Sequence, residues 1–117
     1  MLNTIVMVMN ITGMGIRDLI EEIYRRSIEA RKILSEHVHE TPLITNHTLN
    51  TIVGETVYLK LENMQKTGAF KVRGALYKIH RLVVGEKVRG VVAASSGNHA
   101  QGVAYSAKRY GIEAVIV

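Results

Sequence analysis

The chain has 117 residues, 47% of them apolar, which suits one domain of ordinary size or a piece of a larger protein. Fifteen Lys and Arg against ten Asp and Glu give a net charge of +5, but the basic residues are dispersed and the aromatic residues available for base stacking are five Tyr and one Phe, so we expect no nucleic-acid partner. The absence of cysteine excludes disulfides, thiol catalysis and zinc thiolate sites, and it suits a cytoplasmic location.

The first residues, MLNTIVMVMNITGMG, contain an apolar run that is too short to span a membrane. The run also lacks the basic start and the small-residue cleavage site of a signal peptide. We therefore predict no membrane partner and interpret residues 1–15 as a poorly defined N-terminal extension.

Residues 16–36 carry apolar side chains at helical spacing, which predicts an amphipathic helix that serves packing. The single proline, Pro42, favours an extended piece through residues 43–44. The histidines and the glutamate around this proline do not form a ligand set at a spacing typical of metal sites. We expect no metal site and interpret them as solvated residues of a connecting loop: His37, His39, Glu40 and His47.

The rest of the chain alternates between predicted strands and helices. We expect strands at residues 56–62, 88–94 and 112–117, and helices at residues 70–84, ending at Gly85, and 99–110. The last strand, helix and strand form a parallel βαβ unit, so the fold class is α/β. A parallel sheet is normally covered on both faces, which two strands and one helix cannot accomplish. We therefore expect the chain to be the N-terminal part of a larger protein.

The stretch ENMQKTGAFKVRGA places Lys71 at the start of a predicted helix. The positive end of the helix dipole, the charge of Arg73 and the poorly solvating Phe70 all favour an uncharged amine, which is the form that makes an imine. The alternative, which the local sequence by itself favours, is that Lys71 is a surface lysine that points into water.

The stretch SSGNHAQG, residues 95–102, lies between a predicted strand and a predicted helix. Open α/β sheets bind ligands at this position, and free backbone N–H groups with Ser and Asn side chains suit a carboxylate or a phosphate. A generic turn also favours Gly, Ser and Asn, and the stretch matches neither a phosphate P-loop nor the dinucleotide fingerprint. Together, a poised lysine and an anion-binding loop indicate a pyridoxal phosphate enzyme that handles amino acids.

At this point the sequence resembles the serine/threonine dehydratase and serine racemase group of fold type II pyridoxal phosphate enzymes. The resemblance covers residues 16–117 and is carried by LKLENMQKTGAFKVRGAL, by AASSGNHAQGVAYSAKRYG and by TPL at residues 41–43. It implies a two-domain α/β enzyme with a parallel or mixed sheet and flanking helices. Residues 16–85 would contribute to the larger cofactor domain, and residues 86–117 would begin the smaller domain.

The resemblance also implies roles for individual residues. Lys71 would hold pyridoxal 5'-phosphate as an imine and then remove the α-proton of the substrate. Phe70 would pack beside the pyridine ring, and Asn98 would hydrogen-bond the ring oxygen of the cofactor. Ser96 matches the acid or base of the opposite face in racemases. The substrate carboxylate would be bound by Ser95, Ser96, Asn98 and His99.

The implied reaction is the deamination of L-threonine or L-serine to a 2-oxo acid and ammonia, with a homo-oligomer as the complete enzyme. Ala69 departs from the serine that many members have, which removes one possible hydrogen bond and no indispensable step. In the family, the Gly-rich loop for the cofactor phosphate comes later than Val117. We therefore expect little or no turnover from these 117 residues alone. The alternatives are an inactive remnant, a serine racemase, or a small basic module that binds an anion without chemistry.

Overall fold

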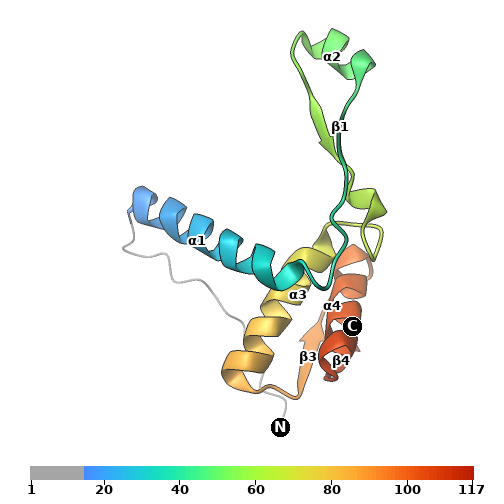
Figure 1. Cartoon of the computed structure of the whole chain (residues 1–117). Coiled ribbons are helices and arrows are strands. Elements are labelled where there is room, and N and C mark those ends of the chain that lie inside the picture. The colour runs from blue at the N-terminus through green and yellow to red at the C-terminus, as the bar shows by residue number, and fades with distance from the viewer. Residues whose placement is uncertain (1–14) are drawn as a thin grey trace.

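The structure is a computed structural model that describes residues 15–117, so most of the predicted extension at residues 1–15 lies outside the described residues. Figure 1 shows a body formed by α3, α4, β3 and β4, from which α1 and a hairpin with α2 at its tip project in different directions. The elements are α1 (Ile16–Leu34), β1 (Leu43–Thr45), α2 (His47–Val53), β2 (Tyr58–Lys60), the 3-10 turn η1 (Glu62–Met64), α3 (Lys71–Arg81), the π-helical turn η2 (Leu82–Glu86), β3 (Gly90–Ala93), α4 (Asn98–Tyr110) and β4 (Glu113–Ile116).

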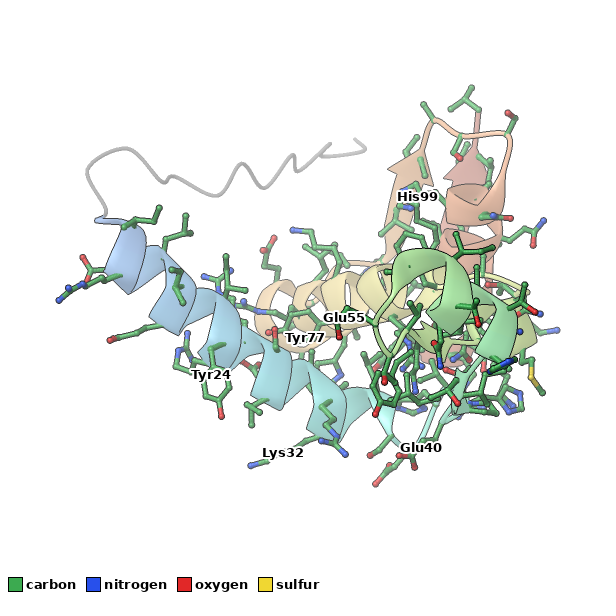
Figure 2. All side chains as sticks on the ribbon, turned by 90° about the horizontal axis from the view of Figure 1, so that it is seen from above. Tyr24, Lys32, Glu40, Glu55, Tyr77 and His99 are labelled. Atoms are coloured by element: carbon green, nitrogen blue, oxygen red, sulfur yellow. The ribbon has the colours of Figure 1, made fainter. Side chains whose placement is uncertain are left out.

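The predicted first helix is confirmed as α1, which ends at Leu34, two residues before the expected end. Leu34 is buried, whereas Ile16, Ile20, Ile23 and Tyr24 in the N-terminal half are exposed, and Figure 2 shows Tyr24 projecting away from the rest of the molecule. Glu22 forms ion pairs with Arg25 and Arg26 on the same helix. The helix therefore contacts the body mainly through its C-terminal end.

The extended piece after Pro42 is confirmed as β1, which pairs antiparallel with β2 in the register Leu43↔Lys60 to Thr45↔Tyr58. Between these strands lies α2, which the sequence analysis did not predict. The Asn46 side chain accepts a hydrogen bond from Leu49 N at 3.0 Å, and Gly54 ends the helix with a φ of 79°. Both are ordinary cap residues at the two ends of a helix.

The core lies between α3, α4 and the parallel strands β3 and β4. Its buried residues come from the two helices, and partly buried side chains of the strands pack against them: Ala75, Ile79, Val103 and Ala107, with Val91, Ala93 and Ala114. The strands pair in the register Gly90↔Glu113 to Ala93↔Ile116. The predicted parallel βαβ unit is therefore confirmed.

The end of α3 differs from the prediction. The apolar pattern predicted a helix to residue 84 that stops at Gly85, but the α-helix ends at Arg81 and continues as η2. The turn closes at Lys87, which has a φ of 52° and whose N–H bonds to Leu82 O. A π turn keeps the side chains near helical spacing, so the sequence pattern does not distinguish it from an α-helix.

Within residues 15–117, no helix combines the length and the apolar character needed to cross a membrane. Over the same range, no three His, Asp or Glu side chains form a group that could hold a metal ion. His47 lies in α2, whereas His37 contacts α4, where Arg109 Nη2 is 3.1 Å from His37 Nδ1.

Candidate functional site

The two predicted motifs lie at the starts of two adjacent helices. Lys71 is the first residue of α3, and Asn98 is the first residue of α4. Both helices begin at the same end of the body (Figure 1). A Cβ atom at Gly102 would lie 3.2 Å from both N and Cα of Val72, so the first turn of α3 is in direct contact with the N-terminal half of α4. The fold thus brings together two motifs whose residues Lys71 and Asn98 are 27 positions apart in the sequence.

The loop SSGN lies at the carboxyl ends of the parallel strands, as predicted. Val117 N donates to Ala93 O at 3.0 Å, and Ser95 N donates to Val117 O at 3.0 Å, so these hydrogen bonds continue the β3–β4 ladder into the loop. Gly97 precedes α4 and offers no side-chain cap to its first turn. The backbone N–H groups of that turn are therefore available to an anion.

A cavity of about 510 Å³ lies between α3, β3 and the start of α4. Phe70 and Lys71 line it from one side, Val91 to Ala93 from the sheet, and His99 and Val103 from α4. Figure 2 shows His99 beside the β3–β4 sheet. Of the predicted site residues, Phe70, Lys71 and His99 line the cavity, whereas Ser95, Ser96 and Asn98 lie on the adjoining loop and first turn of α4.

The side chains of the predicted site are accessible. Ser95 is half-buried, and Lys71, Ser96, Asn98 and His99 are exposed. Phe70 is 59% exposed, and the Nζ atom of Lys71 lies 5.1 Å from the centroid of its ring. This is a cation–π contact between neighbouring residues. Lys71 thus lines the cavity and is exposed, so a small molecule can reach its amine.

The predicted role of Arg73 is wrong. Its guanidinium makes two hydrogen bonds of 2.8 Å to the carboxylate of Glu62, one from Nε and one from Nη2. The Arg73 hydrogen bonds are the main cause that lowers the pKa of Glu62 from 4.5 to about 2. A paired guanidinium does not act as a free positive charge beside Lys71. The sequence did not reveal this partner because Glu62 lies eleven residues earlier, across a turn.

Several polar residues near the site were not singled out from the sequence. Thr41 and Gln65 are buried, at 3% and 5% exposure. Thr41 donates a hydrogen bond to Glu62, the partner of Arg73, and Gln65 accepts one from Lys66 N in the turn before Lys71. Gly102, which allows the close contact with Val72, was considered only as part of a fingerprint that does not match. The ENMQ sequence before the lysine does not mark Gln65 as buried, and only the structure shows that this side chain is buried with a specific partner, His39.

The residues present fit pyridoxal phosphate. The cavity has the size of ordinary small-molecule sites and is lined largely by apolar side chains, which suits an aromatic ring. The accessible Lys71 amine that lines it can bond an aldehyde, and the uncapped first turn of α4 offers N–H donors to anionic groups. These three features match the ring, the aldehyde and the anionic groups of this cofactor.

Comparison with known proteins agrees with a pyridoxal phosphate site. Residues 34–117 match a family described as pyridoxal-phosphate dependent enzyme. The chain belongs to this family of pyridoxal phosphate enzymes. The predicted likeness to the dehydratase and racemase group is confirmed as well, by relatives and by solved structures that carry those names.

Three of these similar proteins show the extent of the likeness. An L-threonine ammonia-lyase of Thermotoga maritima is 54% identical over 89 residues, which are 76% of this chain and 22% of that protein. The crystal structure of serine racemase from Dictyostelium discoideum matches with a TM-score of 0.73 at 41% identity, over 79% of this chain and 31% of that one. The crystal structure of maize serine racemase matches with a TM-score of 0.71 at 41% identity, over 79% of this chain and 29% of that one. The chain thus spans less than a third of the length of each.

Proposed function

We propose that the chain is part of an enzyme that deaminates L-threonine, L-serine or both to a 2-oxo acid and ammonia. The observation that carries this proposal is that Lys71 lines the same cavity as His99 of the SSGNHAQG helix start. The named relatives support the substrate class, because a 54% identical protein is an L-threonine ammonia-lyase. A hydroxyl group on the β-carbon is what threonine and serine share, and its loss is the step that makes deamination possible.

In this proposal Lys71 has two roles, which are to bind the cofactor covalently and to remove the α-proton through Nζ. When bound, pyridoxal phosphate supplies the electron sink that makes this proton acidic. Phe70 would pack beside the pyridine ring of the bound cofactor. Asn98 would hydrogen-bond its ring oxygen. The substrate carboxylate is bound by the free N–H groups of the first turn of α4 together with Ser95, Ser96, Asn98 and His99.

A second candidate function is serine racemisation. The observation that favours it is the 44% identity over 89 residues to a serine racemase of Dictyostelium discoideum. Ser96 lies on the exposed loop before α4, and in this function its hydroxyl would carry the proton on the face opposite Lys71. Racemisation and deamination share the removal of the α-proton and differ only in the later steps, so one site can support both.

The remaining parts of the proposal concern the whole protein. The complete enzyme is a cytoplasmic homo-oligomer without nucleic-acid or membrane partners. Analytical ultracentrifugation of the complete enzyme would give its oligomeric state, and a monomer would contradict this part.

The test of the proposed reaction uses the longest natural protein that contains these residues. Purified protein with pyridoxal phosphate is given L-threonine, L-serine or L-alanine, and 2-oxobutanoate, pyruvate and D-serine are measured. We expect 2-oxo acid from threonine or serine, none from alanine, and none from any substrate after Lys71→Ala. D-serine as the main product would favour the racemase, and unchanged turnover in Lys71→Ala would overturn both functions.

A further inference from the structure

The segment before Pro42 is bound by side chains of the lysine motif. Gln65 makes two hydrogen bonds of 2.8 Å with one residue, since its Oε1 accepts from His39 N and its Nε2 donates to His39 O. Arg73 Nη2 also donates to His39 O, at 3.2 Å. The Thr41 hydroxyl donates to Glu62 Oε1, the oxygen that also accepts from Arg73. We call Glu62, Gln65 and Arg73, with the His39 and Thr41 groups that they bind, the polar clamp.

The clamp is largely shielded from water. Gln65 is 5% exposed and Thr41 is 3% exposed, while the side chains of Glu62 and Arg73 are 18% and 31% exposed. Buried polar groups need partners, because an unpaired donor or acceptor keeps its full desolvation cost. The arginine fork can bind a carboxylate with two parallel bonds and still donate to a carbonyl, which a lysine ammonium does not reproduce.

The clamp binds both ends of the turn that carries Lys71. At one end, Gln65 O accepts from Gly68 N at 2.8 Å and Gln65 Oε1 accepts from Lys66 N at 2.9 Å. The turn passes through Gly68, whose φ of 67° is in the left-handed region. At the other end, Arg73 lies in the first turn of α3, two residues after Lys71. The backbone on both sides of Lys71 is therefore bound to the same segment, residues 39–41, which lies outside the lysine motif.

We propose that Glu62, Gln65 and Arg73 are positioning residues that hold Lys71 Nζ where it meets the cofactor aldehyde. The proposal rests on the proposed function of Lys71 and adds the residues that place its amine. A lysine side chain has a flexible four-carbon stem, so its reach is defined only as well as its Cα is defined. Displacement of the turn by about 1 Å is enough to lose a reactive geometry.

The test compares three variants with the natural protein. Glu62→Gln removes the negative charge that Arg73 binds, and Arg73→Lys keeps the positive charge but removes the fork. Glu22→Gln is the matched control, because it breaks a Glu–Arg pair of the same chemistry on α1. Each protein is incubated with pyridoxal phosphate at neutral pH, trapped with borohydride and mapped by peptide mass. The readouts are the label on Lys71 relative to Lys66 and Lys78, and the amide hydrogen exchange of residues 66–73.

We expect Glu62→Gln and Arg73→Lys to lower the relative label on Lys71 about tenfold or more, the factor for losing one hydrogen bond to a charged group. Exchange at residues 66–73 should become faster in both variants, and Glu22→Gln should leave both readouts unchanged. Selective label on Lys71 at the natural level in both clamp variants would overturn the positioning role and leave the proposed function standing. Absence of selective label in the natural protein would overturn the proposed function, and the positioning role with it.

Discussion

Gly102 of α4 lies against the backbone of Val72, the residue that follows Lys71. A Cβ atom at position 102 would be 3.2 Å from Val72 N, 3.2 Å from Val72 Cα and 3.3 Å from Ala75 Cβ. Two of these three atoms belong to a helix backbone and cannot turn aside, so a side chain at position 102 must push the helices apart. The distance between the lysine and the loop before α4 therefore depends on this glycine.

Gly102→Ala is the first prediction. We expect it to lower the free energy of unfolding by about 1–3 kcal/mol, the usual cost of overpacking a tight contact. Gly74→Ala is the matched control, because Gly74 is also helical and a Cβ there meets nothing within 4 Å. The control should be as stable as the natural protein or up to about 1 kcal/mol more stable, since alanine is the better helix former. Urea unfolding of both variants tests this prediction, and equal stability of the two would contradict the tight contact between Gly102 and Val72.

The stability of the fold should depend on the ionisation of Glu62. Its pKa is lowered from 4.5 to about 2, mainly by the hydrogen bonds from Arg73. A carboxyl group with a lowered pKa stabilises the fold fully above pH 4.5, and this stabilisation disappears as the pH falls toward 2. The loss should be about 1.5–3 kcal/mol, the value of hydrogen bonds to a charged group.

The measurement is the free energy of unfolding from neutral pH down to about pH 2 for the natural protein and for Glu62→Gln. The variant should be less stable at neutral pH, and its curve should lack most of the fall below pH 4.5. Glu22→Gln, which breaks an exposed pair, should keep that fall. Parallel curves for the natural protein and Glu62→Gln would show that this carboxylate does not stabilise the fold.

A hydrogen bond joins the segment after α1 to α4. The hydroxyl of Tyr105 donates to His37 O at 2.9 Å. Tyr105→Phe should lower the free energy of unfolding by about 0.5–1.5 kcal/mol, because it leaves that carbonyl without its donor. Tyr24→Phe is the control, since Tyr24 is 69% exposed on α1. Thermal unfolding checks this, and an equal melting temperature for both variants would contradict the prediction.

Asn98 should affect ligand binding and not folding. Its side chain is exposed at the start of α4, so Asn98→Ala should leave unfolding unchanged. The proposed hydrogen bond to the ring oxygen of the cofactor predicts about tenfold weaker binding of pyridoxal phosphate. Asn63→Ala changes an exposed asparagine outside the cavity and should bind normally. Absorbance titration gives both affinities, and equal values would remove Asn98 from the site.

Much of the body could be predicted from the sequence, because buried strands and amphipathic helices leave clear apolar patterns. The parallel pairing of β3 and β4 followed from two apolar runs on either side of a helix. The hairpin was harder, since β1 and α2 are short and lack buried side chains, so no apolar pattern marks them. The cap residues Asn46 and Gly54 were the available signal for α2.

The site was predicted in part for a similar reason. Lys71 and the SSGNHAQG loop could be located because their chemistry depends on local features, a helix start and a strand end. The partner of Arg73 could not be located, because the ion pair with Glu62 forms only when the turn at residues 65–70 folds back. The position of a charge in the sequence does not say whether it is free or paired.

The most direct test of the account is the site of reaction with pyridoxal phosphate in the natural protein. The purified protein is mixed with a small excess of the cofactor, trapped with borohydride and digested, and the modified lysines are identified by mass. We expect Lys71 to carry most of the label, and L-serine or L-threonine added before trapping should lower it. Label spread evenly over Lys60, Lys66, Lys71 and Lys78 would contradict the central claim that this fold presents one lysine to the cofactor.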